Sequence, residues 1–220
     1  MQARNIKIGD YNTYADGLWT LTGWSLSPAE HEQNFVTVPG SSKPLDLAGA
    51  LTDGEPTYLP RTLVATFESS EGSRLVRKAR IDRMINQLDG WTFNIVLPDD
   101  PDKYLIGKVR VRELYNDTAH ASVQVEAVCH PWKYAKDETV VTVPPASSIQ
   151  MLTLVNKGRR SVVPTLTVEG GEVSLHYASN IWFLGEGVHV LPAIYLTPGE
   201  HALSYSGAGS LTCTYREASL

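Results

Sequence analysis

The sequence predicts a mainly β protein: an N-terminal β-sandwich with one flanking α-helix, followed by a small C-terminal β-sandwich. Three observations carry this prediction. The stretch 91–134 alternates apolar and polar residues with the period of two that is typical of strands. One segment, 73–89, has instead the apolar spacing of an amphipathic helix. Beyond residue 139, short apolar segments recur between turn-forming residues without a helical period.

The N-terminal part contains strand-like segments separated by one long polar stretch. We expect strands at 5–8, 18–25 and 61–68. Between the last two lies the stretch 27–60, rich in Pro, Gly, Ser and acidic residues, in which only 35–38 has a clear strand pattern. A connection of this length inside a compact domain is usually functional or ordered by a partner, although an unremarkable loop fits the sequence equally well.

The predicted helix has a plausible start, a plausible end and one apolar stripe. Ser73 is the expected N-cap, and Gly90 is the expected first residue beyond the C-terminus. The stripe consists of Ile81, Met84, Ile85 and Leu88. Five basic residues are scattered around the helix axis, which indicates a solvated face rather than a phosphate-binding site: Arg74, Arg77, Lys78, Arg80 and Arg83.

A long β-hairpin follows the helix. Val109 and Val111 alternate with basic residues, and the return strand from Ala121 to Cys129 alternates in the same way. Both apolar sets must share one face of the sheet, so directly opposed residues must lie on the same face. This requires an odd number of loop residues, most simply the three residues 116–118.

We place a domain boundary near residue 136, with a first domain at 1–135 and a second at 139–220. Residues 1–138 carry 15 basic and 19 acidic side chains, whereas 139–220 carry 4 and 5, so the charge content drops at this point. In the second domain we expect short strands at 151–155, 162–168, 173–177, 181–184, 189–196, 201–205 and 211–215. Strands at this spacing are typical of a small sandwich.

No recognised catalytic or cofactor-binding motif occurs in the sequence. The GxSxG, HExxH, CxxC and P-loop patterns are all missing. None of the six histidines has metal-ligand spacing with another histidine or a cysteine: His31, His120, His130, His176, His189 and His201. The acidic cluster Asp99, Asp100 and Asp102 lacks the pattern of a calcium loop, so we interpret it as a solvated turn. We therefore expect no enzyme, no cofactor and no metal site.

Composition excludes several other classes of protein. A net charge of −5 argues against a general nucleic-acid binder, and no apolar run approaches the roughly 18 residues of a membrane helix. The first ten residues lack the apolar region of an export signal. The two cysteines, Cys129 and Cys213, lie on alternating segments in opposite halves of the chain, so we expect buried free thiols.

Seven segments, in their order along the chain, resemble the distal tail proteins of long-tailed phages. In the first domain they are GLWTLTGWSLSP, VTVPGSSKPLDLAGALTDGEPTY, INQLDGW, LPDDPDKYLIGKV and CHPWKY. In the second they are VVPTLTVEGG and PGEHALSYSGAGSLTCTYREASL. The resemblance implies a tail-tube-like first domain and a galectin-like second domain.

The same resemblance implies a structural role in the virion after synthesis in the bacterial cytoplasm. Such proteins form a hexameric ring, a hub that connects the tail tube and tape-measure protein to the host-contacting, receptor-binding tip proteins. The segment 36–58 would be an arm that reaches a neighbouring subunit. Its expected interface residues are Val36, Val38, Pro39, Leu45, Leu47, Leu51 and Tyr58.

Carbohydrate binding is the alternative function that the sequence leaves open. The second domain is rich in aromatic residues, and β-sandwiches often present such residues to sugar rings. Tyr205 and Tyr215 alternate in step with the expected core residues, so their side chains should lie on the core face of their strands. This leaves Trp182 as the candidate sugar platform. Packing of Trp182 against the core is the competing interpretation.

Overall fold

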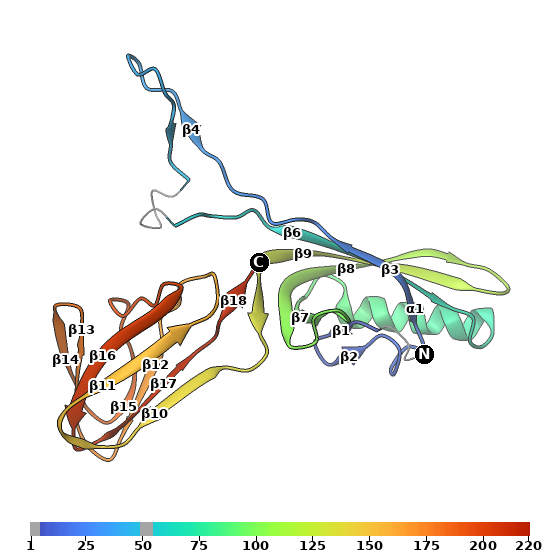
Figure 1. Ribbon diagram of the computed structural model, residues 1–220. Helices are drawn as coiled ribbons and strands as arrows, with labels where there is room; N and C mark the ends of the chain where they lie inside the picture. Colours follow the sequence, from blue (N-terminus) through green and yellow to red (C-terminus); the bar gives the residue numbers. More distant parts are fainter. Residues whose placement is uncertain (1–4, 49–54) are drawn as a thin grey trace. The chain divides into compact units, whose positions relative to one another are not determined.

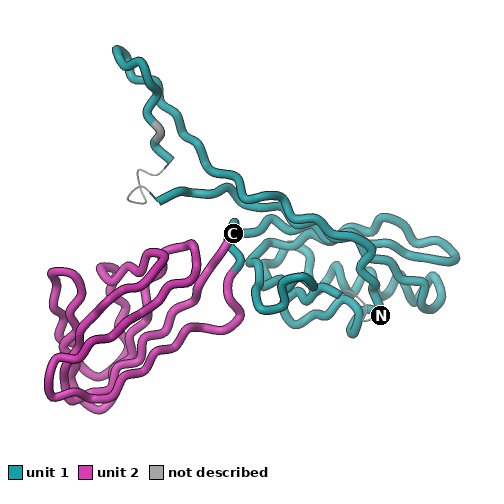
Figure 2. Tube along the Cα trace, viewed as in Figure 1, with its two compact units in different colours: residues 1–133 teal, residues 134–220 magenta. Residues whose placement is uncertain are grey.

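The computed structural model describes residues 5–48 and 55–220, and these confirm the predicted fold class. The described residues are mainly β with one α-helix, and the chain divides into two compact units, Met1–Lys133 and Tyr134–Leu220 (Figure 2). Each unit has its own apolar core, so each is described by itself.

The first unit is built on one antiparallel sheet (Figure 1). The strand order is β2-β1-β7-β8-β9-β6-β3. The strands are β1 (Lys7–Ile8), β2 (Tyr11–Asn12), β3 (Thr20–Leu26), β6 (Arg61–Ser69), β7 (Thr92–Val96), β8 (Lys103–Asn116) and β9 (Ala121–Ala135). Because β6 lies between β3 and β9, the stretch 27–60 leaves and re-enters the sheet at neighbouring strands.

Period-two alternation places the core of this unit on one face of the sheet. In β6 every second side chain is buried, including Leu63 and Phe67, and β9 pairs with it so that Val123 lies opposite Phe67. Trp19 is fully buried in the same core. Directly opposed residues on one face pack against each other, which fixes the register of the pair.

The helix α1 (Arg74–Leu88) covers this core face. Its predicted ends are confirmed: the Ser73 hydroxyl accepts a hydrogen bond from the Val76 amide, and Gly90 has a φ of 82°. The inward residues Ile81, Met84 and Leu88 are buried, as the apolar stripe predicts.

The prediction of a solvated basic face is wrong for one residue, Arg77, which is 1% exposed. Its guanidinium donates to the carbonyl oxygens of Gly72, Asp117 (2.9 Å) and Thr118 (3.1 Å). The helix therefore holds the β8–β9 turn through a buried cation. A periodicity argument could not find this contact, because the acceptors belong to a distant turn.

The β8–β9 turn has four residues, 117–120, and not the predicted three. The carboxylate of Asp117 accepts hydrogen bonds from the amides of Ala119 and His120, both at 2.7 Å. These two bonds hold the pKa of Asp117 below its usual value. The side chain thus stabilises a longer turn than the strand pattern alone requires.

The second unit is a sandwich of two four-stranded sheets, as predicted. One has the order β10-β17-β12-β15 and the other β11-β16-β13-β14. The strands are β10 (Thr139–Val143), β11 (Ala146–Asn156), β12 (Thr165–Glu169), β13 (Val173–Tyr177), β14 (Asn180–Leu184), β15 (Gly187–Val190), β16 (Gly199–Gly207) and β17 (Ser210–Tyr215). A short strand, β18 (Ala218–Ser219), pairs with the end of β9, next to the hydrogen bond from the Ala135 amide to the Glu217 carbonyl (2.9 Å).

Both cysteines are buried free thiols, as predicted. Burial raises the pKa of Cys129 to about 11 and that of Cys213 to about 12. Because the thiolate is the reactive form, we expect neither residue to react with a thiol reagent at about pH 8 while the protein is folded, and both to react once it is denatured. Titration with Ellman's reagent tests this; prompt labelling of either native thiol would contradict it.

Candidate functional site

The most distinctive feature of the first unit is an arm, residues 28–60, between β3 and β6. Its two chain segments run side by side away from the ends of these strands (Figure 1). The Ser27 amide donates to Thr62 O (2.9 Å), the Leu59 amide to Glu30 O (2.9 Å) and the Glu32 amide to Thr57 O (3.0 Å). Further out, β4 (Phe35–Val36) pairs with β5 (Leu45–Asp46). The described arm is therefore a hydrogen-bonded ribbon rather than an irregular loop.

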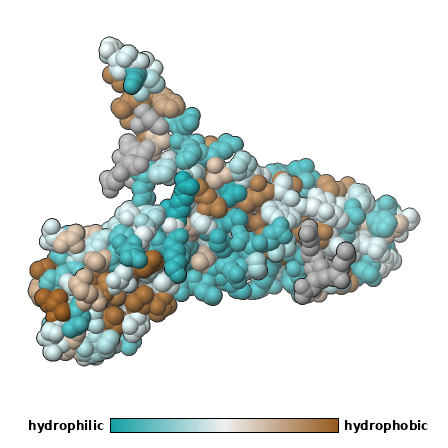
Figure 3. Space-filling model, in the orientation of Figure 1, coloured by the Kyte–Doolittle hydropathy of each residue, from teal (hydrophilic) through white to brown (hydrophobic). Residues whose placement is uncertain are grey.

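Apolar side chains are exposed on this ribbon (Figure 3). Val36 lies directly opposite Leu45, and Leu47 lies two residues beyond Leu45, so these three share one face. They are 42%, 53% and 38% exposed, and Phe35 on the opposite face is 57% exposed. Among the described residues, none of the first core comes from the arm. An exposed patch of apolar side chains outside any core is typical of an interaction site.

Most of the expected interface residues lie on this exposed surface. Val38 and Pro39 are also exposed, at the turn beyond β4. Leu51 lies outside the described residues. Tyr58 differs from the others because it is buried, with 9% exposure. Phe35, which was not among the expected interface residues, lies in the strand-like segment 35–38 that the sequence did indicate.

Tyr58 anchors the base of the arm. Its ring centroid lies 4.5 Å from that of His31 on the opposite segment and 5.2 Å from that of Trp132 in β9, in an edge-on arrangement. Next to it, Arg61 Nε donates to Ser27 O (2.8 Å). Aromatic pairs of this kind stabilise by about 0.5–1.5 kcal/mol beyond their buried area. The base is thus fixed to the sheet while the outer part is solvated.

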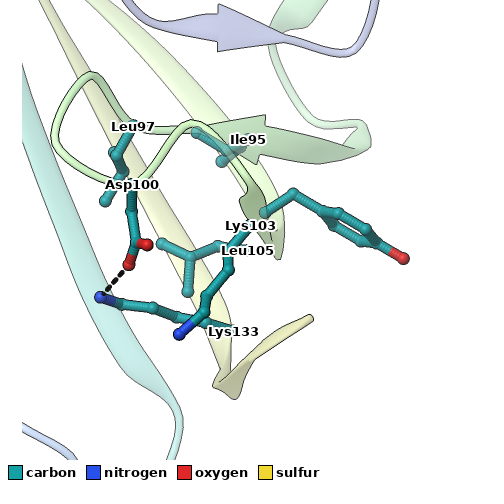
Figure 4. Close-up of a pocket in the computed structure, with 7 residues that line it drawn as sticks. Ile95, Leu97, Asp100, Lys103, Leu105 and Lys133 are labelled. Carbon is teal, nitrogen blue, oxygen red and sulfur yellow. Dashed lines mark hydrogen bonds and ion pairs between the residues drawn. The ribbon is translucent and has the colours of Figure 1, made fainter. Parts of the chain in front are cut away.

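The acidic loop after β7 forms a turn and also holds an ion pair (Figure 4). Asp100 bonds Lys133 Nζ at 2.7 Å, which links this loop to the end of β9. The apolar residues Ile95, Leu97 and Leu105 lie beside the pair, and the hollow they line has no room for a ligand. The motif residues Asp100 and Lys133 therefore have a structural role.

A second hollow, of about 490 Å³, is open to solvent beside α1. It is lined by Ile8, Asp10, Tyr11, Asp16, Arg83, Gln87, Leu88 and Phe93. Burial and then the charge of Asp16 raise the pKa of Tyr11, so its phenol stays protonated at neutral pH. The protonated Tyr11 phenol is therefore not a nucleophile at neutral pH.

The second unit places Trp182 in a half-buried position against the second core. The exposed aromatic residue of β14 is instead its neighbour Phe183, which is 80% exposed. His201 contacts the Tyr177 hydroxyl (2.8 Å) and the Thr197 carbonyl (2.7 Å), so its ring has a structural role. Within the described ranges, no group of three or more His, Cys, Asp and Glu side chains is arranged to hold a metal ion. The described chain also contains no helix that is long and apolar enough to span a membrane.

No protein-family model matches the sequence, and no curated protein matches it either. A solved structure does: the Dit protein (gp 19.1) of SPP1, described as a paradigm of the hub adsorption apparatus in phages that infect Gram-positive bacteria. The two chains superpose with a TM-score of 0.68 at 14% identity. The match covers 98% of this chain and 99% of the SPP1 chain, so both units and their order along the chain are shared.

Proposed function

We propose that this chain is a structural hub subunit of a phage or prophage tail tip. Six copies form a ring that connects the tail tube and the tape-measure protein to the host-contacting, receptor-binding tip proteins. The observation that carries this proposal is the likeness in fold to SPP1 Dit over the full length of both chains. The order of the motifs that resemble distal tail proteins supports it independently.

The arm supports assembly with further copies of the chain. It exposes Val36, Leu45, Leu47 and Phe35 on a ribbon that leaves the core of its own unit. When the arm of one subunit binds a different surface of the next subunit, the contact is heterologous. A ring of such contacts closes only at a fixed copy number. The number six comes from the resemblance to distal tail proteins.

Native mass, measured by light scattering and followed by negative-stain imaging, tests the proposal. Six chains of 24.2 kDa give a particle of about 145 kDa, and we expect a ring with a central hole. A tail-tube protein from the same phage should bind one face of that ring. A protein that stays monomeric at every concentration, alone and when mixed with the tail-tube protein, would contradict the proposal.

A further inference from the structure

A row of three cations lies on the outer face of β8. Lys108, Arg110 and Arg112 are exposed, and they alternate with Val109 and Val111, which are buried in the core. Neighbours in the row are two residues apart, which is about 6.8 Å along a strand. None of the three takes part in a salt bridge with a described residue. We call these residues the β8 row.

No salt bridge within the described residues neutralises the β8 row. Glu126 lies on the adjacent strand β9 but makes no salt bridge with the row in the described chain. Leu114, the next outward residue of β8, is 45% exposed, and Val128 on β9 is 55% exposed. The outer face of these strands therefore combines unpaired positive charge with apolar surface, in a chain whose net charge is −5.

The arm carries the complementary charge. Residues 28–60 contain five acidic side chains and a single lysine: Glu30, Glu32, Asp46, Asp53, Glu55 and Lys43. Glu30 and Glu32 are exposed and form no salt bridge within the described residues.

These two glutamates have the spacing of the β8 row. Their segment is extended, because His31 pairs with Tyr58 and backbone hydrogen bonds flank that bridge on both sides. Alternate side chains of an extended segment point to opposite faces. His31 contacts Tyr58, so Glu30 and Glu32 point together away from it, about 6.8 Å apart.

We infer that the β8 row of one copy binds the base of the arm of a second copy, with Arg110 and Arg112 facing Glu30 and Glu32. This inference rests on the proposed function, in which copies assemble through the arm. The equal spacing allows two charge pairs to form at once. The apolar face of the arm and the exposed Leu114 and Val128 supply the uncharged part of such an interface.

Charge reversal tests the pairing. We expect Arg110→Glu with Arg112→Glu to raise the midpoint concentration of assembly by about tenfold or more, and Glu30→Arg with Glu32→Arg to do the same. The variant that carries all four changes should assemble close to the wild-type midpoint. Assembly of the wild type should weaken as salt is raised, since exposed charge pairs are screened.

Matched controls separate this effect from a general change in charge. Arg74→Glu with Arg83→Glu makes the same change in net charge on the exposed side of α1 and should leave the midpoint unchanged. Circular dichroism should show that all variants are folded. A cross-link between Glu32→Cys in one copy and Arg112→Cys in another would place the two segments side by side, because both native thiols are buried.

The possible outcomes separate this inference from the proposed function. If reversal of the β8 row leaves assembly unchanged while loss of the arm abolishes it, the inference is overturned and the proposed function stands. A defect that the fourfold variant does not restore also overturns the pairing. If reversal abolishes binding of a single-stranded DNA oligonucleotide without affecting assembly, the row is a polyanion site instead. A wild type that never assembles contradicts both.

Discussion

Replacement of residues 33–56 by a four-residue Gly/Ser linker is expected to convert the assembled ring into folded monomers. The ends of this segment lie side by side, because the Glu32 amide donates to Thr57 O at 3.0 Å, so a short linker can close the gap. His31, Tyr58 and Trp132 stay in place at the base. Light scattering should show the loss of the particle of about 145 kDa that six chains of 24.2 kDa would form.

The same replacement should leave the fold of the first unit intact. No described arm residue belongs to its core, so the far-ultraviolet spectrum and the unfolding midpoint should change little. Val188→Ser is the matched control, since Val188 is 68% exposed on β15, outside the arm. That variant should assemble like the wild type. An arm-deleted protein that still forms the full particle would remove the arm from the interface.

Much of the fold follows from local patterns in the sequence. Strict alternation places Leu63 and Phe67 inside the first unit, and the structure buries both. The helix has its predicted ends because the Ser73 cap and Gly90 act through neighbouring backbone atoms. Such features need no knowledge of distant residues, so periodicity and capping rules suffice to predict them.

These rules do not predict contacts between segments that are distant in the sequence. The turn after β8 has four residues because the carboxylate of Asp117 stabilises that length, which strand parity does not reveal. Tyr58 is buried because Trp132, a residue of β9, packs against its ring. The sequence of the segment 36–58 by itself does not distinguish this buried anchor from its solvated neighbours.

The candidate site was predictable in position but not in detail. Length and composition single out the segment 27–60, although they fit an unremarkable loop as well as a segment that is ordered by a partner or carries function. Which of its residues share a face depends on the pairing of Val36 with Leu45, which only the ribbon defines. The β8 row is visible as alternation in the sequence, yet the absence of a salt bridge to it among the described residues depends on how the sheet is assembled.

Arg77→Ala is expected to lower the free energy of unfolding of the first unit by about 3 kcal/mol. The substitution removes hydrogen bonds to the carbonyls of Gly72, Asp117 and Thr118 from a site where the native side chain is only 1% exposed. These part-buried hydrogen bonds are then lost, and with them the link that Arg77 makes between α1 and the β8–β9 turn. Guanidinium unfolding followed by circular dichroism at the helix band measures the change.

Arg74→Ala is the control, because Arg74 lies in the same helix with an exposed side chain. Removal of such a surface side chain should change stability by no more than about 0.5 kcal/mol. Arg77→Lys should recover only part of the loss. A single ammonium group cannot reach all the acceptors that the two terminal nitrogens of the guanidinium bond in the wild type. Equal stability of the Arg77→Ala and Arg74→Ala variants would show that the buried guanidinium does not hold the turn. In that case the network of Asp117 with the amides of Ala119 and His120 would have to be sufficient by itself.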